Sequence, residues 1–253
     1  MLKGLFGEKT FLDPDLEAWV LEAWTWLMSQ SGGAQNLSAI TLATPSSEHF
    51  PPTEAKSHER ALYVFGRIKT LMGIPHWPCE LIAIAADDRH RQLSESLGLA
   101  YRTNNAQGLF QVSKGQVSIS YEAGLVNRPP KLIAVLAHEL AHYLLVTIKE
   151  PPPGGEEAHE LLTELTVTYA GFGIFGANSA FEFQQDSRGW RASRSGYFSE
   201  RTWIFALALF VALRGKDEDP TRWLKPEGGK LFRQALRYLE RRPELLDGLR
   251  APA

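Results

Sequence analysis

The segment from Leu132 to Leu145 places two histidines and a glutamate inside an otherwise apolar run, LIAVLAHELAHYLL. A helix through this run is apolar on nearly every side, which indicates a helix buried in the core of the protein. Buried histidines and carboxylates must be paired, hydrogen-bonded or bound to a metal. The chain therefore needs a fold that encloses this helix and supplies partners for its three ionisable side chains.

The two histidines have the spacing of a metal-binding pair. His138 and His142 are four residues apart, so their side chains lie one above the other on a helix and can converge on one ion. Glu139 can reach a metal-bound water without being a ligand. This H-E-x-x-H arrangement is typical of zinc sites in which an activated water attacks a carbonyl. The alternative is a pair of hydrogen-bonded core histidines with Glu139 at an edge.

A catalytic zinc site needs a third protein ligand and one open position. Leu145 and Ile148 stand where the metzincin motif requires Gly and His, which excludes that solution. Glu160 follows in the next acidic cluster, and a second helix antiparallel to the first can present it to the metal. Glu164, one turn further, can accept the N–H of a ligand imidazole. Four other third ligands remain open: Glu164 itself, His159, Glu156 and Glu157.

The H-E-x-x-H motif followed by Glu160-Leu-Leu-Thr-Glu164 resembles the gluzincins, the thermolysin-like zinc peptidases, in which Glu-x-x-x-Asp follows on a downstream helix. The resemblance covers roughly residues 108–176. It implies that His138, His142 and Glu160 bind Zn²⁺ and that Glu139 is the general base.

The chain departs from the gluzincin pattern at two positions. His159 stands where thermolysin-like enzymes carry Asn, and Glu164 replaces Asp with a side chain one methylene longer. The longer segment is also similar to uncharacterised bacterial proteins with an HELAH…GxGxF layout.

These motifs predict a zinc-dependent hydrolase, a metallopeptidase of narrow specificity that acts on a peptide or protein. Glu139 would move the proton, and Tyr197 is the candidate oxyanion stabiliser. Glu164 would hold His138 through its second nitrogen. Two alternatives remain open. One is a catalytically silent metal-binding regulatory or interaction protein on the same scaffold, and the other is hydrolysis of a non-peptide amide.

Charge, cysteine content and apolar run lengths limit the partners and the compartment. The net charge of −2 shows no excess of the basic residues that nucleic-acid-binding proteins carry. Cys79 is the only cysteine, so no disulfide framework or thiolate zinc site is expected. The longest apolar run is too short to span a bilayer, and the first residues lack the apolar core of a signal peptide. We expect a cytoplasmic protein without nucleic-acid or membrane partners.

The apolar patterns predict a mostly helical α+β fold, zincin-like, in which a small mixed sheet packs on the H-E-x-x-H helix and the C-terminal half is helical. We expect a single domain, 1–253, of two lobes, 1–129 and 130–253. Helices are expected over 14–30, 54–72, 199–214 and 227–241, and strands over 37–42, 81–86, 110–112 and 116–121. The last two strands are expected to form a hairpin that turns at Lys114 and Gly115.

Several finer expectations follow from the same patterns. The tryptophans of the 14–30 helix should pack on the core rather than form a ligand platform. The strand 116–121 is either a sheet edge that binds peptide or an ordinary sheet strand. Gly171 should let the second metal-binding helix approach the first. A polar loop over 181–197, which contains Arg188, Arg191 and Arg194, and a frayed tail from 242 are also expected.

Overall fold

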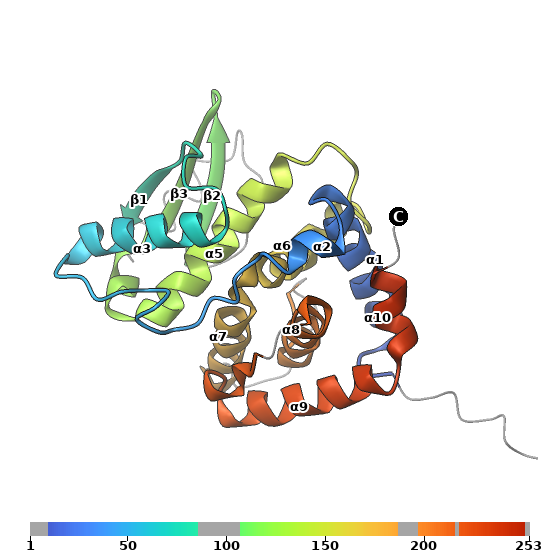
Figure 1. The fold of residues 1–253 in the computed structure, drawn as a ribbon. Coiled ribbons are helices and arrows are strands. Elements are labelled where there is room, and N and C mark those ends of the chain that lie inside the picture. Colours follow the sequence, from blue (N-terminus) through green and yellow to red (C-terminus); the bar gives the residue numbers. More distant parts are fainter. Residues whose placement is uncertain (1–9, 86–106, 187–196, 216–217, 251–253) are drawn as a thin grey trace, which may run out of the picture.

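The computed structural model of the protein describes residues 10–85, 107–186, 197–215 and 218–250 (Figure 1). It has an α+β fold with a mixed three-stranded sheet, as the sequence predicts. Its elements are α1 (Pro14–Gln30), α2 (Ala34–Leu37), α3 (Ser57–Leu71), β1 (Glu80–Ile84), β2 (Gly108–Ser113), β3 (Gln116–Glu122), η2 (Ala123–Asn127), α5 (Pro129–Val146), η3 (Glu156–Ala158), α6 (His159–Val167), η4 (Thr168–Phe172), α7 (Gly173–Asp186), α8 (Glu200–Arg214), η6 (Pro220–Arg222), α9 (Pro226–Glu240) and α10 (Pro243–Arg250).

The sheet has the strand order β1-β3-β2, with β1 parallel and β2 antiparallel to β3. The predicted hairpin turns at Lys114 and Gly115, whose φ angles of 50° and 78° both lie in the left-handed region. Two-residue hairpin turns with two positive φ angles match the twist of the strands they join. Because β3 is the central strand, the interpretation of 116–121 as an ordinary sheet strand is confirmed and its interpretation as a sheet edge is wrong.

One face of the sheet is packed on helices α3 and α5 (Figure 1). Phe110 of β2 lies against the rings of His142 and Tyr143 on α5, with ring centroids 6.2 and 5.9 Å apart. Tyr121 of β3 stacks on His58 of α3, and the Tyr121 hydroxyl lies 3.0 Å from His58 Nδ1. Burying aromatic side chains of this size stabilises the fold by roughly 1.5–3 kcal/mol each. These contacts hold the sheet against the helix that carries both histidines.

Helices α6 and α7 are separated by a π-helical turn, in which Gly171 has a φ angle of 92°. A β-carbon on Gly171 would lie 2.0 Å from the carbonyl oxygen of Thr41. The N–H of Ala43 donates to the carbonyl of Gly171 at 2.9 Å. Gly171 therefore makes room for the segment after α2, and not for α5 as expected. The strand predicted over 37–42 is also wrong, because this segment crosses the helix break instead of joining the sheet.

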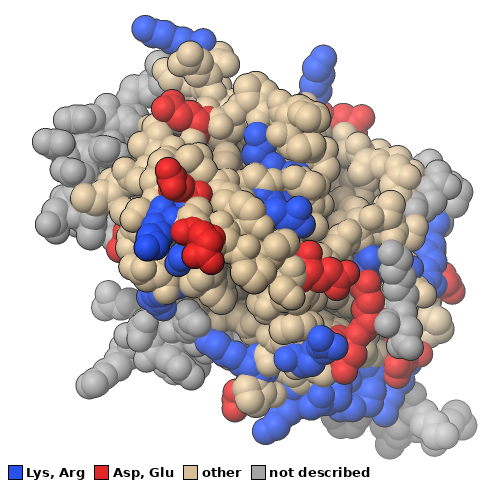
Figure 2. All heavy atoms as spheres, turned by 60° about the vertical axis from the view of Figure 1, so that its left-hand side comes forward, with Lys and Arg blue, Asp and Glu red and all other residues tan. Residues whose placement is uncertain are grey.

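The helices expected over 199–214 and 227–241 are present as α8 and α9. The Ser199 hydroxyl accepts the N–H of Thr202 at 3.1 Å and starts α8, which is buried along most of its length. Helix α9 buries Phe232 and Leu239 and exposes its basic residues. Figure 2 shows Lys and Arg side chains gathered along the lower edge of the molecule, where α9 lies in Figure 1.

Two predicted irregular segments are helical. Residues 181–186 belong to α7 rather than to a loop, and Pro243–Arg250 forms α10 with Leu249 buried rather than a frayed tail. Arg188, Arg191 and Arg194 lie outside the described residues.

Helix α1 packs on α6 and α10, beside the C-terminal helices (Figure 1). Trp24 is fully buried, and Trp19 and Trp26 pack against the same core, so the core-packing prediction for this helix is confirmed. Within the described ranges, no helix combines the length and the apolar character needed to cross a membrane.

Candidate metal centre

Helices α5 and α6 bring the predicted ligands together. Helix α5 carries His138 and His142 one turn apart, and both are buried. The chain then turns through 147–158, where the indole N–H of Trp19 donates to the carbonyl of Pro153 at 3.3 Å. Helix α6 returns alongside α5 and carries Glu160 in its first turn (Figure 1).

The three side chains present their ligand atoms to one small volume. The Nε2 atoms of His138 and His142 are 3.1 Å apart, and Glu160 Oε2 lies 3.4 and 3.9 Å from them. Two ligand atoms bound to one tetrahedral zinc at 2.0–2.1 Å lie about 3.3 Å apart. The described part of the chain contains one group of three His, Cys, Asp or Glu side chains close enough to hold an ion, and it is this one.

Glu160 Oε2 is the most informative atom of the cluster for metal binding. It is buried and has no hydrogen-bond partner, although it faces both imidazole nitrogens. A buried carboxylate oxygen without a partner is costly, and a cation at the centre of the cluster would satisfy it. The donor set of two imidazole nitrogens and one carboxylate oxygen also suits zinc. The residues therefore fit a zinc ion.

The second nitrogen of His142 contacts α6. Its Nδ1 lies 3.0 Å from His159 Nε2 and 3.2 Å from the hydroxyl of Thr163. His159 thus meets the nitrogen that does not face Glu160, so its geometry does not favour it as a third ligand. Burial, with His138 and His159 as neighbours, lowers the pKa of His142, which keeps the imidazole neutral as a metal ligand must be. The remaining alternatives, Glu156 and Glu157, are exposed in η3 and stand outside the cluster.

Glu139 lies inside the core, not at the edge of the helix. Its side chain is fully buried, and neither carboxylate oxygen has a hydrogen-bond partner. Burial and the charge of Glu160 raise the pKa of Glu139 well above its ordinary value, while the nearby amide of Phe110 acts in the opposite direction. A raised pKa makes a carboxylate a stronger proton acceptor.

Tyr197, the predicted oxyanion stabiliser, lies beside the cluster. Its ring centroid is 6.4 Å from that of His138, and its hydroxyl is buried without a hydrogen-bond partner. Burial raises the pKa of Tyr197 above its ordinary value, and the charges of Glu160, Glu164 and Glu139 raise it further. The hydroxyl therefore keeps its proton and remains a donor.

Glu164 differs from its predicted role. Its Oε2 accepts the backbone N–H of Phe198, and among the described residues Glu164 makes no hydrogen bond to His138. Burial raises the pKa of Glu164, and the Phe198 N–H opposes this shift. Glu164 therefore ties the segment that carries Tyr197 to α6 instead of orienting an imidazole.

Two further residues contribute to the site although the sequence does not predict them. Thr163 and Gly108 carry no metal-binding or catalytic signature, yet Thr163 contacts His142 and Gly108 lies against Glu139. Thr163 stands four residues after His159, so the helical repeat places both on one side of α6, and this spacing is the signal that identifies it. Gly108 has no comparable signal, because its proximity to Glu139 depends on how β2 packs on α5.

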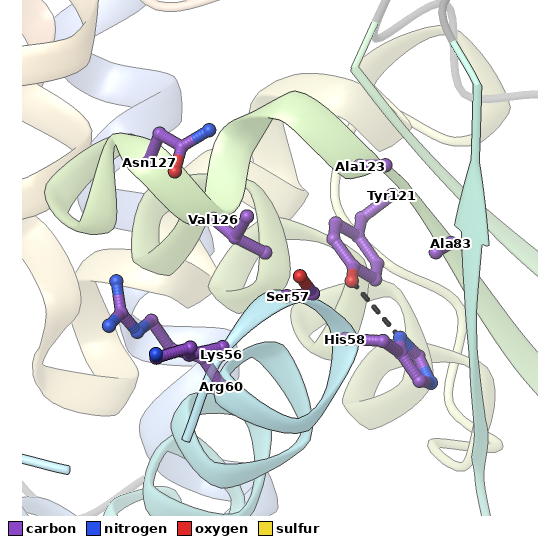
Figure 3. Close-up of a pocket in the computed structure, with 9 residues that line it drawn as sticks. All are labelled: Lys56, Ser57, His58, Arg60, Ala83, Tyr121, Ala123, Val126 and Asn127. Atoms are coloured by element: carbon purple, nitrogen blue, oxygen red, sulfur yellow. Dashed lines mark hydrogen bonds between the residues drawn. The ribbon is translucent and has the colours of Figure 1, made fainter. Parts of the chain in front are cut away.

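A hollow of about 660 Å³ lies apart from the cluster, between the first turn of α3, the ends of β1 and β3, and η2 (Figure 3). Lys56, His58 and Tyr121 are among the residues that line it, and none of the predicted site residues does. Tyr121 connects the two regions, because in the sheet register it is paired with Gly108.

Comparison of the chain with family models, with curated proteins and with solved structures found no match. Evidence for a function therefore comes from the side chains of the cluster and from the chemistry that their arrangement permits.

Proposed function

We propose that the protein is a zinc-dependent hydrolase and that its substrates are peptides or proteins. The observation that carries the proposal is the carboxylate of Glu139, which is buried without a hydrogen-bond partner, follows His138 directly in α5 and is near enough to Glu160 for that charge to raise its pKa. A site that only stabilises the fold has no use for an unpaired base, and structural zinc sites are closed by four protein ligands. Three ligands leave one coordination position for water or substrate.

His138, His142 and Glu160 would hold the metal. When bound, zinc supplies a Lewis acid that lowers the pKa of a water molecule and polarises a carbonyl. Glu139 takes the proton of the attacking water and passes it to the leaving nitrogen. Its raised pKa supports this role, because a carboxylate near its ordinary pKa is a weak base at neutral pH.

Tyr197 would donate its hydroxyl hydrogen bond to the oxyanion that forms on the substrate carbonyl. Its hydroxyl is already desolvated and has no other partner, so it loses no existing hydrogen bond when it binds the oxyanion. The bond from Phe198 to Glu164 fixes the chain next to Tyr197. Donors held in place before the reaction stabilise developing charge better than donors that must reorganise.

The sheet favours an extended peptide over a small amide as the substrate. Within the described residues, β2 is hydrogen-bonded to β3 along one edge only. The first residue of β2, Gly108, lies against Glu139. A peptide that added itself as a strand to the other edge would pass the general base with its backbone aligned, and alternate side chains would provide specificity.

The test combines two measurements on the purified protein. Elemental analysis is expected to find about one zinc per chain, in line with the one group of three ligands among the described residues. Mass spectrometry of a peptide library incubated with the protein is expected to find a small set of cleaved bonds, and a chelator should abolish cleavage. Zinc without cleavage of any peptide would favour the silent metal-binding alternative, and absence of zinc would overturn the proposal.

A further inference from the structure

We propose that His159 and Thr163 are positioning residues that hold His142 in the tautomer protonated on Nδ1, so that Nε2 presents its lone pair to the metal position. The inference rests on the proposed function for its consequence in metal binding. Its structural part, the tautomer of His142, applies to the metal-free protein as well.

The hydrogen bonds around Thr163 determine which atom is the donor. The Thr163 hydroxyl donates its only hydrogen to the carbonyl of His159 at 2.9 Å. The same oxygen lies 3.2 Å from Nδ1 of His142, so it can only accept there. With the hydroxyl hydrogen on the His159 carbonyl, the Thr163–His142 contact is a hydrogen bond only when Nδ1 of His142 carries the hydrogen.

His159 provides a second acceptor for the same hydrogen. Its Nε2 lies 3.0 Å from His142 Nδ1, and the two rings are stacked with centroids 5.1 Å apart. If His142 carried its proton on Nε2, an N–H would point at His138 Nε2 and Glu160, and Nδ1 would face the Thr163 oxygen without a hydrogen between them. In that tautomer the hydrogen on Nε2 would also prevent this nitrogen, which faces the metal position, from binding a metal.

The arrangement makes α6 responsible for two functions of the site. His159 and Thr163 are four residues apart and share one side of the helix, and Glu160 follows His159 directly. The helix that supplies the carboxylate ligand thus also fixes the orientation of the second imidazole. Among the described residues, His138 has no hydrogen bond to its second nitrogen, so the effect belongs to His142 alone.

Matched substitutions separate the acceptor function from the space that each side chain fills. His159→Gln places an amide oxygen near the position of Nε2, and His159→Leu removes the acceptor. Thr163→Ser keeps the hydroxyl, and Thr163→Val removes it with little change in shape. Cobalt(II) and zinc affinities are measured by competition with a chelator, and the visible absorption of the cobalt-loaded protein reports the ligand geometry.

Loss of an orienting partner typically weakens metal binding about 10–100-fold. We expect such a loss of metal affinity for His159→Leu and for Thr163→Val. The metal affinities of His159→Gln and Thr163→Ser should lie within about threefold of the parent affinity. Because two acceptors share one hydrogen, the double variant should lose more than the product of the single losses. Parent affinities and unchanged cobalt spectra in His159→Leu, in Thr163→Val and in the double variant would overturn the inference and leave the proposed function intact.

The tautomer is tested without metal. Two-bond ¹H–¹⁵N correlation spectra of the metal-free protein, assigned with a His142→Gln variant, identify which nitrogen of His142 carries the hydrogen. We expect Nδ1–H in the parent and a mixture of tautomers in the double Leu/Val variant. A parent that is protonated on Nε2 overturns the inference whether or not the protein binds zinc. A parent with Nδ1–H that binds no zinc supports the positioning role and contradicts the proposed function.

Discussion

Gly108 lies so close to Glu139 that a β-carbon on residue 108 would stand 2.5 Å from Glu139 Oε1 and 2.8 Å from Val135 Cγ1. The absence of a side chain at the start of β2 thus creates the space that the Glu139 carboxylate occupies. The sheet, through this one residue, sets where the base of the proposed reaction stands. The relationship links the packing of β2 on α5 directly to the chemistry of the cluster.

The substitution Gly108→Ala is expected to displace the Glu139 carboxylate, because real β-carbons do not approach other atoms this closely. Misplacing a catalytic group by about 1 Å costs on the order of 10²-fold in turnover, while zinc content should stay at the parental level. Peptide hydrolysis and elemental analysis measure the two quantities. Gly66→Ala is the matched control, since a β-carbon there meets nothing within 4 Å. Equal turnover in the two variants would contradict the prediction.

The substitution Glu139→Gln keeps the shape of the side chain and removes its ability to accept the proton. Hydrolysis should fall by at least about 10²-fold, in line with the usual contribution of a general base. Zinc affinity should stay near that of the parent, because Glu139 is outside the group of three ligands. Steady-state kinetics and chelator competition test the two parts, and a variant that hydrolyses peptides at the parental rate would exclude Glu139 as the base.

The substitution Tyr197→Phe removes a hydroxyl that has no partner in the structure. Folding stability should therefore be retained, since no hydrogen bond is lost. Turnover should fall by about 10²–10³-fold if the hydroxyl stabilises the oxyanion. Thermal unfolding and kinetics are compared with the parent, and an unchanged turnover number would rule out that role.

The substitution Glu164→Leu distinguishes the contact in the structure from the one predicted by sequence. The structure has Glu164 bound to the Phe198 N–H, next to Tyr197. Turnover should then fall with little change in zinc affinity, because the oxyanion donor loses its support. An imidazole-orienting role would instead weaken zinc binding about 10–100-fold. Chelator competition on the variant decides between these outcomes.

Burial raises the pKa of the Cys79 thiol to about 11, and nearby Lys69 lowers it only in part. At pH 8 about 0.1% of this thiol is ionised, compared with about a quarter of an ordinary cysteine. Alkylation by iodoacetamide at pH 8 should therefore be roughly 200-fold slower than for free cysteine, and faster as the pH rises toward 11. Unfolding in urea should restore the ordinary rate, and rapid alkylation of the folded protein would contradict the prediction.

Helix starts and tight turns could be predicted from the sequence, because they depend on residues that are adjacent in the chain. Asp13 caps α1, its side chain accepts the N–H of Asp15 at 3.1 Å, and the helix begins at Pro14 as expected. Lys114 and Gly115 likewise form the predicted turn. The strand expected over 37–42 does not form, because a strand needs a hydrogen-bonded partner strand. The alternation of apolar residues does not reveal that this segment packs against Gly171 instead.

The residue spacing alone determined that His138 and His142 share one side of a buried helix, because the helical repeat makes that a local property. It also placed Glu160 and Glu164 one turn apart on a second helix. Only the tertiary structure decided that Glu160 faces both imidazoles while His159 and Thr163 meet the far nitrogen of His142. It also decided that Glu164 holds Phe198 and that Gly108 makes room for Glu139. These contacts depend on the angle and offset at which α6 and β2 pack on α5, and the packing of many distant side chains sets both.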